Sequence, residues 1–399
     1  MPAPAELKAR LRASVEDSAD SILAVSHRLH ADPELGWQEV RSVALLTAQL
    51  DALGFTIDRD VAGLPTAFVA SRGSGPVVVG LIAEYDALAG IGHACGHNII
   101  AAATIGAAAA LAPHADELGI TLQVIGTPAE EGGGGKIYLL DAGVFDRLDL
   151  AMMIHPGPVD SVMARPRAVA HFDVEYTGKA SHAGAYPHLG RNAADAFTVA
   201  QVGIGLLRQQ LPDSVRVHGI VTEAGTAPNA IPETAKGSWY VRADSLEQLD
   251  GIFDRVSACF AAGALATGCE WELRETSPRY AEFRNDVALA NLFTANAAAL
   301  GRDMDPDELL PGGMNTASTD LGNVSQRVRA IHPYLGIGSL PAVNHQAEFA
   351  AASVTATADR AVLDGAILLA QTIVDAVTTE SFPREADPQT AGDLTDPKE

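Results

Sequence analysis

Three continuous apolar runs constrain the fold of this chain more than any other feature of its sequence. They cover residues 77–83, 121–126 and 148–154. Such runs are typical of strands that are buried on both faces, as in a parallel sheet covered by helices. The alanine-rich segment 98–118 lies between the first two runs and has the length of a helix. Strand, helix and strand in this order predict an α/β fold with a mixed, mostly parallel sheet flanked by helices.

Polar side chains follow each of these strands at the point where it ends. Asp86 comes after the first strand, Glu130 and Glu131 come after the second, and His155 comes after the third. In open α/β sheets, ligands bind beyond the carboxyl ends of the strands. We therefore expect acids and histidines from three strands to meet at one edge of the sheet.

A different pattern begins near residue 168. Strand, helix, two strands, helix and strand follow one another, which predicts an inserted α+β domain of the ferredoxin-like kind. We expect residues 1–167 and 278–382 to form one discontinuous domain, with 168–277 as the insert. The polar segment 383–399 contains prolines and is expected to be a disordered tail.

Composition excludes several classes of partner. The chain has 50 acidic and 27 basic residues, and its formal net charge of −23 argues against nucleic acids and anionic membranes. An anionic substrate would need a local cationic pocket. No apolar run is convincing as a membrane span, and the N-terminus lacks the features of a signal peptide. The three cysteines provide no disulfide framework, which favours a reducing cytoplasm.

Several residues have side chains that bind metals, although each has a simpler explanation when taken alone. Cys95 and His97 stand together before a predicted helix, and thiolate and imidazole are preferred ligands of zinc. A buried structural cysteine with nearby histidines fits equally well. Glu130 and Glu131 are adjacent carboxylates, which are costly to bury without a cation, but a solvated acidic turn also explains them. A single histidine such as His155 indicates little by itself.

Taken together, these residues indicate a centre for two metal ions. The donors come from separate strand ends and loops: Cys95, His97, Glu131, His155 and His345. Two metals can activate a water molecule and polarise a carbonyl group. Glu130 would remain unbound as general base, and Asp86 would orient a ligand imidazole. The donor set suits Zn²⁺ or Mn²⁺.

The motifs that carry these residues resemble a known family. The most specific pieces are 92–98, 128–135, 179–184 and 229–232. They resemble the aminoacylase/carboxypeptidase family of metallopeptidases (peptidase family twenty), over nearly the whole chain. Within that family, the segment 317–325 is similar to the amidohydrolase branch that includes p-aminobenzoyl-glutamate hydrolase and β-alanyl-lysine dipeptidase.

The resemblance implies a zinc-aminopeptidase-like catalytic domain and an inserted lid, through which members of the family usually form homodimers. It implies two divalent metal ions per subunit and Glu130 as general base. His182, Asn229 and Arg242 match lid residues that reach the substrate in relatives, His182 at the oxyanion and Arg242 at a carboxylate. His188 is a rival for the oxyanion position. Polar residues such as these also stabilise turns, and Arg242 could be an ordinary strand residue.

These observations favour metal-dependent hydrolysis of an amide bond in a dipeptide or an N-acyl amino acid. The products would be the acyl or aminoacyl group and an amino acid that carries a free carboxylate. The alternative is a catalytically silent binding or regulatory subunit of a two-chain amidohydrolase. The ligand set with Glu130 is complete, whereas silent relatives tend to lose one such group, so an enzyme is the favoured hypothesis.

Overall fold

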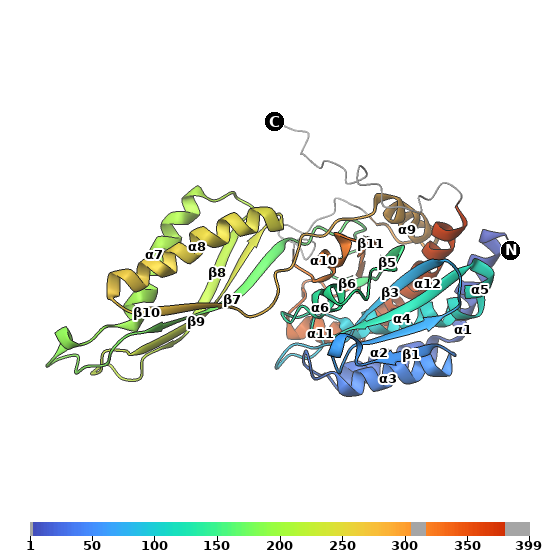
Figure 1. The fold of residues 1–399 in the computed structure, drawn as a ribbon. Helices are drawn as coiled ribbons and strands as arrows, with labels where there is room; N and C mark the ends of the chain where they lie inside the picture. Colours follow the sequence, from blue (N-terminus) through green and yellow to red (C-terminus); the bar gives the residue numbers. More distant parts are fainter. Residues whose placement is uncertain (1–2, 305–316, 380–399) are drawn as a thin grey trace. The chain divides into compact units, whose positions relative to one another are not determined.

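The protein is described here from a computed structural model, which covers residues 3–304 and 317–379. The chain divides into two compact units, shown in Figure 1. Unit 1 comprises Met1–Pro166 and Phe283–Glu399, and unit 2 comprises Arg167–Glu282. The expected tail 383–399 lies outside the described residues.

Unit 1 is built on a sheet of six strands in the order β1-β2-β4-β3-β5-β11. The strands β4, β3, β5 and β11 run parallel to one another, and β1 and β2 are antiparallel to their neighbours. A separate parallel pair joins β12 and β6. The predicted class, a mixed and mostly parallel α/β sheet flanked by helices, is confirmed. The strands are β1 (Thr56–Arg59), β2 (Phe68–Arg72), β3 (Val77–Glu84), β4 (Ile120–Thr127), β5 (Leu150–Met152), β6 (His155–Gly157), β11 (Arg329–Ile331) and β12 (Tyr334–Gly336).

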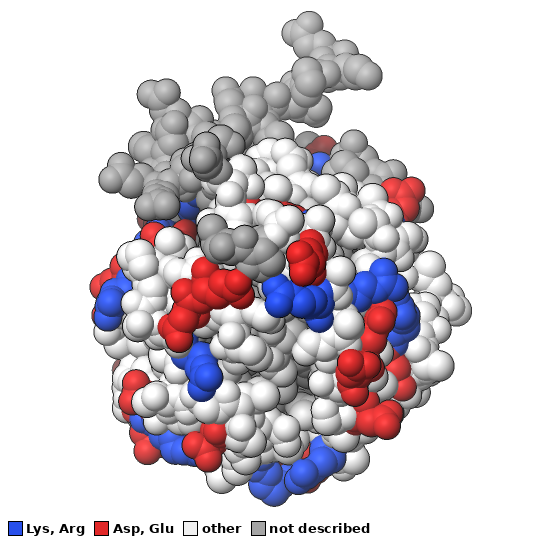
Figure 2. Space-filling view, turned by 90° about the vertical axis from the view of Figure 1, so that its right-hand side faces the viewer, with Lys and Arg blue, Asp and Glu red and all other residues white. Residues whose placement is uncertain are grey.

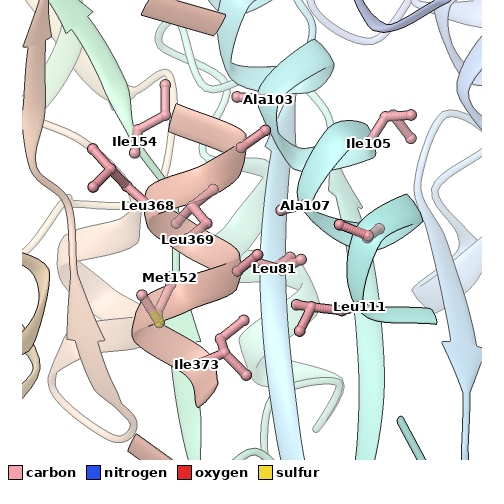
Figure 3. Packing of buried hydrophobic residues seen from close by; sticks show 14 of the residues in the cluster. Leu81, Ala103, Ile105, Ala107, Leu111, Met152, Ile154, Leu368, Leu369 and Ile373 are labelled. Atoms are coloured by element: carbon pink, nitrogen blue, oxygen red, sulfur yellow. The ribbon is translucent and has the colours of Figure 1, made fainter. Parts of the chain in front are cut away.

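The two faces of this sheet carry separate hydrophobic cores because side chains alternate along each strand. In β3, Leu81 belongs to the larger core and Ile82 to the smaller one. Figure 3 shows Leu81 and Met152 of the sheet beside Ala107 and Leu369 of two long helices. The helices of the larger core are α1 (Pro4–Asp17), α2 (Ala19–Ala31), α3 (Val40–Ala52), α4 (His97–Leu111), α9 (Val287–Ala299) and α12 (Ala356–Thr378).

The smaller core lies under α6 (Gly135–Asp141) and α10 (Leu321–Ser325). These helices contact each other, and they cover the face toward which the even-numbered residues of β3 point. This face is therefore the one toward which Glu84, the last residue of β3, is directed. The short elements of unit 1 are η1 (Val61–Gly63), η2 (Ala112–His114), α5 (Ala115–Leu118) and α11 (Ala347–Ala352).

Two stretches of unit 1 are long and apolar enough to cross a membrane, namely His97–Leu118 and Ala356–Thr378. Their apolar windows are 83% and 78% buried within the fold. Helices of the central core of a globular domain have the same composition, because they are covered on all sides. Both stretches are core helices here.

Unit 2 is a four-stranded antiparallel sheet in the order β10-β7-β9-β8, with the chain order strand, helix, strand, strand, helix, strand. This is the ferredoxin-like arrangement. The helices α7 and α8 pack against each other and share one apolar core with the sheet. Its elements are β7 (Ala168–Thr177), η3 (Pro187–Leu189), α7 (Ala193–Leu207), η4 (Arg208–Gln210), β8 (Arg216–Ala224), β9 (Thr234–Ala243), α8 (Leu246–Thr267) and β10 (Glu270–Glu275).

Candidate metal centre

The start of α4 places two candidate ligands on either side of a glycine. Gly96 has a φ of +84° and is the residue before the helix. A Cβ atom at this position would lie 2.4 Å from Cγ of Pro156, so only glycine fits. The tight turn directs Cys95 and His97 toward β6. The side chain of Asn98 does not cap the helix; it donates hydrogen bonds to the Ser26 hydroxyl and to the carbonyl of Ser353.

Hydrogen bonds orient the rings of His97 and His155, the two buried histidines among the candidate ligands. Nδ1 of His97 lies 2.9 Å from Oδ1 of Asp86, and Nδ1 of His155 lies 2.8 Å from the carbonyl oxygen of Pro156. Each Nδ1–H is therefore a donor, so that in the neutral ring Nε2 carries the free lone pair. Nε2 of His155 lies 3.6 Å from the Cys95 sulfur. Asp86 thus orients a candidate ligand, as expected, and its other oxygen accepts the backbone N–H of Glu131 at 3.0 Å.

The loop after β4 brings two carboxylates to the same place. Oε1 of Glu131 lies 3.4 Å from Nε2 of His345 and 3.9 Å from Nε2 of His97. Oε2 of Glu130 lies 3.8 Å from that same His97 nitrogen. The backbone N–H of His345 donates to the carbonyl of Ala94 at 2.8 Å, which fastens this distant loop beside Cys95. The five predicted ligands are therefore brought together, with Glu130 among them.

The donor atoms fit the two divalent metal ions that the chemistry of the set implies. Three groups of side chains have ligand atoms within 4.8 Å of one another. In the described part of the chain, Nε2 of His97 and Oε1 of Glu131 are buried without a hydrogen-bond partner. Buried polar atoms left in this way are costly unless a cation satisfies them. The groups are Cys95–His97–His155, Cys95–Glu131–His345 and Glu84–His97–Glu130.

The protonation states of the buried side chains at this site also depend on whether a cation is bound. Burial raises the pKa of the Cys95 thiol well above its usual value, and Glu131 adds to the rise. Burial likewise raises the pKa of Glu130, together with the charges of Glu84 and Glu131. Burial lowers the pKa of His155 well below its usual value, which keeps this imidazole neutral and able to bind metal. A bound cation would stabilise the ionised thiolate and carboxylates.

The remaining predicted site residues lie in unit 2. His182, His188 and Asn229 are exposed, and Arg242 on β9 is partly buried. Nδ1 of His182 accepts the backbone N–H groups of Gly184 and Ala185 at 3.2 and 3.0 Å, which is the turn-stabilising contact that the simpler explanation predicts. The expected contacts of these four residues with a substrate stay a prediction.

Four further buried residues lie beside the centre, and the sequence pattern gave none of them a role. Lys136 of α6 contacts Glu84 and Asp320, each at 2.6 Å. Glu39 accepts the backbone N–H of Ala129 at 2.8 Å. Glu84 could have been found because it lies two residues after Ile82 on a buried strand and so points to the same face. Lys136 could have been found because a charged residue stands among the apolar residues of a short helix. Asp320 lies in the segment 317–325 that carries part of the family resemblance.

The comparisons with known proteins place the chain in a family. The family model described as "Peptidase family M20/M25/M40" matches residues 81–373. The chain is 37% identical to a mouse Xaa-Arg dipeptidase over 386 residues, which cover 93% of this chain and 89% of the relative. It is 33% identical to one of the subunits of p-aminobenzoyl-glutamate hydrolase from Escherichia coli (strain K12), over 65% of this chain and 59% of that protein.

Solved structures share the fold over most of the chain. One is an aminobenzoyl-glutamate utilization protein from Klebsiella pneumoniae, with a TM-score of 0.68, 24% identity, and coverage of 89% of this chain and 98% of that one. Another is a Bacillus subtilis protein described as a dinuclear metal binding peptidase of the M20 family, with a TM-score of 0.68, 23% identity, and coverage of 91% and 99%. At these identities the likeness shows the fold alone, and the predicted family resemblance is confirmed by the family model and the mouse relative.

Proposed function

The chain belongs to peptidase family M20/M25/M40 and is a hydrolase, and on this premise we propose that it cleaves an amide bond in a dipeptide or an N-acyl amino acid with the help of two divalent metal ions. The observation that carries the proposal is the convergence of five donor side chains in two groups that share Cys95, with the unpartnered Nε2 of His97 among them and Glu130 beside it. Zn²⁺ fits the thiolate, and Mn²⁺ fits the carboxylate and imidazoles.

The charges of the chain also support two divalent ions. Five carboxylates interact at this centre, and one buried ammonium group, that of Lys136, accompanies them. If all are ionised together with the Cys95 thiol, six negative charges and one positive charge leave an excess of five, most of which two divalent ions would balance. The carboxylates belong to Glu84, Asp86, Glu130, Glu131 and Asp320.

In the proposed mechanism, Glu130 transfers the proton, while activation of the water and the amide carbonyl is the role of bound metal ions. When bound, divalent ions supply Lewis acidity, which acidifies water and polarises the amide carbonyl. Glu130 accepts the proton of the attacking water on its carboxylate and gives it to the leaving nitrogen. The buried surroundings that raise its pKa suit a group that must hold a proton between these two steps.

We extend the proposal to the residues that bind substrate. Because Nδ1 of His182 is an acceptor, its neutral ring carries the proton on Nε2, which can donate to a developing oxyanion. This supports His182 in that role. The guanidinium group of Arg242 has the fork geometry that pairs with a carboxylate, and Asn229 would add a polar contact. The mouse and human relatives are named Xaa-Arg dipeptidases, so dipeptides that end in arginine are the first substrates to try.

We also propose that the protein is a cytoplasmic homodimer, joined through unit 2. The strand β8 is at the edge of its sheet, with Ile220 65% exposed. On α7, Val202 is 59% exposed and Leu206 is 72% exposed. An edge strand beside exposed apolar side chains is a surface that natural proteins usually cover. The three cysteines are free thiols, which supports a reducing compartment.

Replacing Glu130 with Gln tests the catalytic proposal. The amide keeps the size of the side chain but cannot accept the proton, so we expect kcat to fall by about a thousandfold, within the range for loss of a general base. Metal content, measured by mass spectrometry of the purified protein, should stay at the wild-type level. The exposed Glu247→Gln serves as the control. Retained activity in the Glu130 variant would remove this residue from the mechanism.

A further inference from the structure

Lys136 is a completely buried lysine clamped by two acids. Its Nζ atom lies 2.6 Å from Oε1 of Glu84 and 2.6 Å from Oδ1 of Asp320, and all three side chains are at most 1% exposed. The backbone N–H of Lys136 also donates to Oδ2 of Asp320 at 2.9 Å. Asp320 therefore holds this residue at both its backbone and its side chain.

This arrangement would be costly if it served packing alone. Burying an ammonium group costs several kcal/mol, and an apolar side chain of similar volume is often as stable. The chain nevertheless packs closely at the residue before Lys136. A Cβ atom on the preceding Gly135 would lie 1.9 Å from the carbonyl oxygen of Pro128, so α6 begins directly against the segment that carries Glu130.

Glu84 connects this lysine to the metal centre. Its Oε2 atom lies 3.5 Å from Nε2 of His97, and Glu84 forms a possible ligand group with His97 and Glu130. Glu84 could thus act as a further carboxylate ligand. Its Oε1 atom, however, is already paired with Lys136.

We propose that Lys136 is a positioning residue of the metal centre, a built-in cation that restrains Glu84 and sets the affinity of the centre for its ions. The inference rests on the proposed metal-dependent function. The positive charge of the ammonium group offsets one negative charge at the centre, and its contact with Oε1 holds Glu84 in place. Without it, the centre would attract cations more strongly and would be less stable when empty, because buried carboxylates would repel one another.

Three variants separate charge from packing: Lys136→Met, Glu84→Gln and the double variant. The measurement is the dissociation constant for Zn²⁺, by chelator competition on metal-stripped protein, together with the rise in Tm when Zn²⁺ is added. We expect Lys136→Met to bind Zn²⁺ tighter by roughly tenfold or more, and Glu84→Gln to bind it weaker by a similar factor. The double variant should return close to the wild type, and Lys136→Met should show the larger rise in Tm.

Lys8 supplies the matched control. Its Nζ atom lies 2.7 Å from Oδ2 of Asp375, in a partly exposed Lys–Asp ion pair between α1 and α12. Lys8→Met should lower stability slightly and leave Zn²⁺ affinity unchanged.

The outcomes are distinct. If folded Lys136→Met binds Zn²⁺ no tighter than the wild type does, the inference is wrong. If Lys136→Met does not fold, the comparison of Glu84→Gln with the double variant decides. The double variant should bind tighter because it lacks the lysine charge, and equal affinities would overturn the inference. If the wild-type protein binds no metal at all, the proposed function itself fails.

Discussion

Two residues at the metal centre adopt a backbone conformation that side chains disfavour. Ala129, which precedes Glu130, has a φ of +52°, and His345 has a φ of +69°. Such a conformation costs on the order of 1–3 kcal/mol per residue and persists only where the surroundings enforce it. The backbone N–H of Ala129 is held by Glu39, and that of His345 by the carbonyl of Ala94. These two strained positions are thus those that aim the proposed general base and a candidate ligand.

Glu39 provides a test of this idea. Replacing it with Ala removes the acceptor for Ala129, so Glu130 should lose its fixed position, and we expect kcat to fall by roughly ten- to a hundredfold. Glu39→Gln keeps an oxygen acceptor and should retain most of the activity. Steady-state kinetics on protein of verified metal content makes the comparison. Equal kcat values for the Ala variant and the wild type would contradict the role.

At the scale of elements, strand alternation decides which residues face the site and which face a core. In β3, Leu81 packs with the large helices, while Ile82 and Glu84 point toward the α6 side. In unit 2, the alternation along β7 places His171 on the face opposite the apolar core, where it is buried beside Tyr240, with ring centroids 4.2 Å apart. A buried neutral histidine makes the stability of an element depend on pH.

Burial, with the nearby charges of Arg242 and His218, lowers the pKa of His171 to about 4. The unfolded chain binds a proton near pH 6.5, whereas the folded chain does not, so the free energy of unfolding should fall as the pH drops from about 6.5 to about 4. His171→Gln removes this group, and we expect the loss on acidification to shrink by about 3 kcal/mol. Urea denaturation at a series of pH values measures it. Parallel curves for the two proteins would show that His171 does not titrate in this way.

At the scale of the whole molecule, the net charge of −23 is the dominant long-range feature. Figure 2 shows acidic and basic side chains intermixed over one face, with no large region of one sign there among the described residues. The field of such a protein attracts cations over a distance that salt shortens. A cationic substrate would therefore be favoured in the encounter step.

A pair of substrates tests this effect. For a dipeptide that ends in arginine, kcat/KM should fall several-fold as ionic strength rises from about 0.02 to about 0.3 M. The same dipeptide with citrulline has nearly the same shape without the positive charge, and it should change less. Identical salt dependence for both substrates would exclude long-range attraction as a source of selectivity.

The proposed dimer is tested at the same scale. Leu206→Glu with Ile220→Lys places charges on the exposed apolar surface of α7 and β8, and we expect this variant to sediment as a monomer. Leu265→Glu, on α8 at a position 86% exposed, is the matched control and should leave the oligomeric state unchanged. A wild-type protein that sediments as a monomer at micromolar concentration would refute the homodimer.

The sequence alone was sufficient for the fold class, the family and the choice of candidate ligands. Local pattern carries this information, because alternation and helical periodicity report which face of an element is buried, and strand ends in an α/β sheet share one edge. The motifs at residues 92–98 and 128–135 therefore predicted a metal centre before any distance was known.

Only the tertiary structure decided which charged side chains contact one another. Lys136 and Asp320 are 184 residues apart in the chain and 2.6 Å apart in space, and neither has a neighbour in sequence that indicates the pairing. Sequence spacing describes one element at a time, whereas the energy of a buried charge depends on partners that distant elements supply. The restraint on Glu84 and the fixing of Ala129 by Glu39 therefore emerge only from the folded chain, where packing brings these groups together.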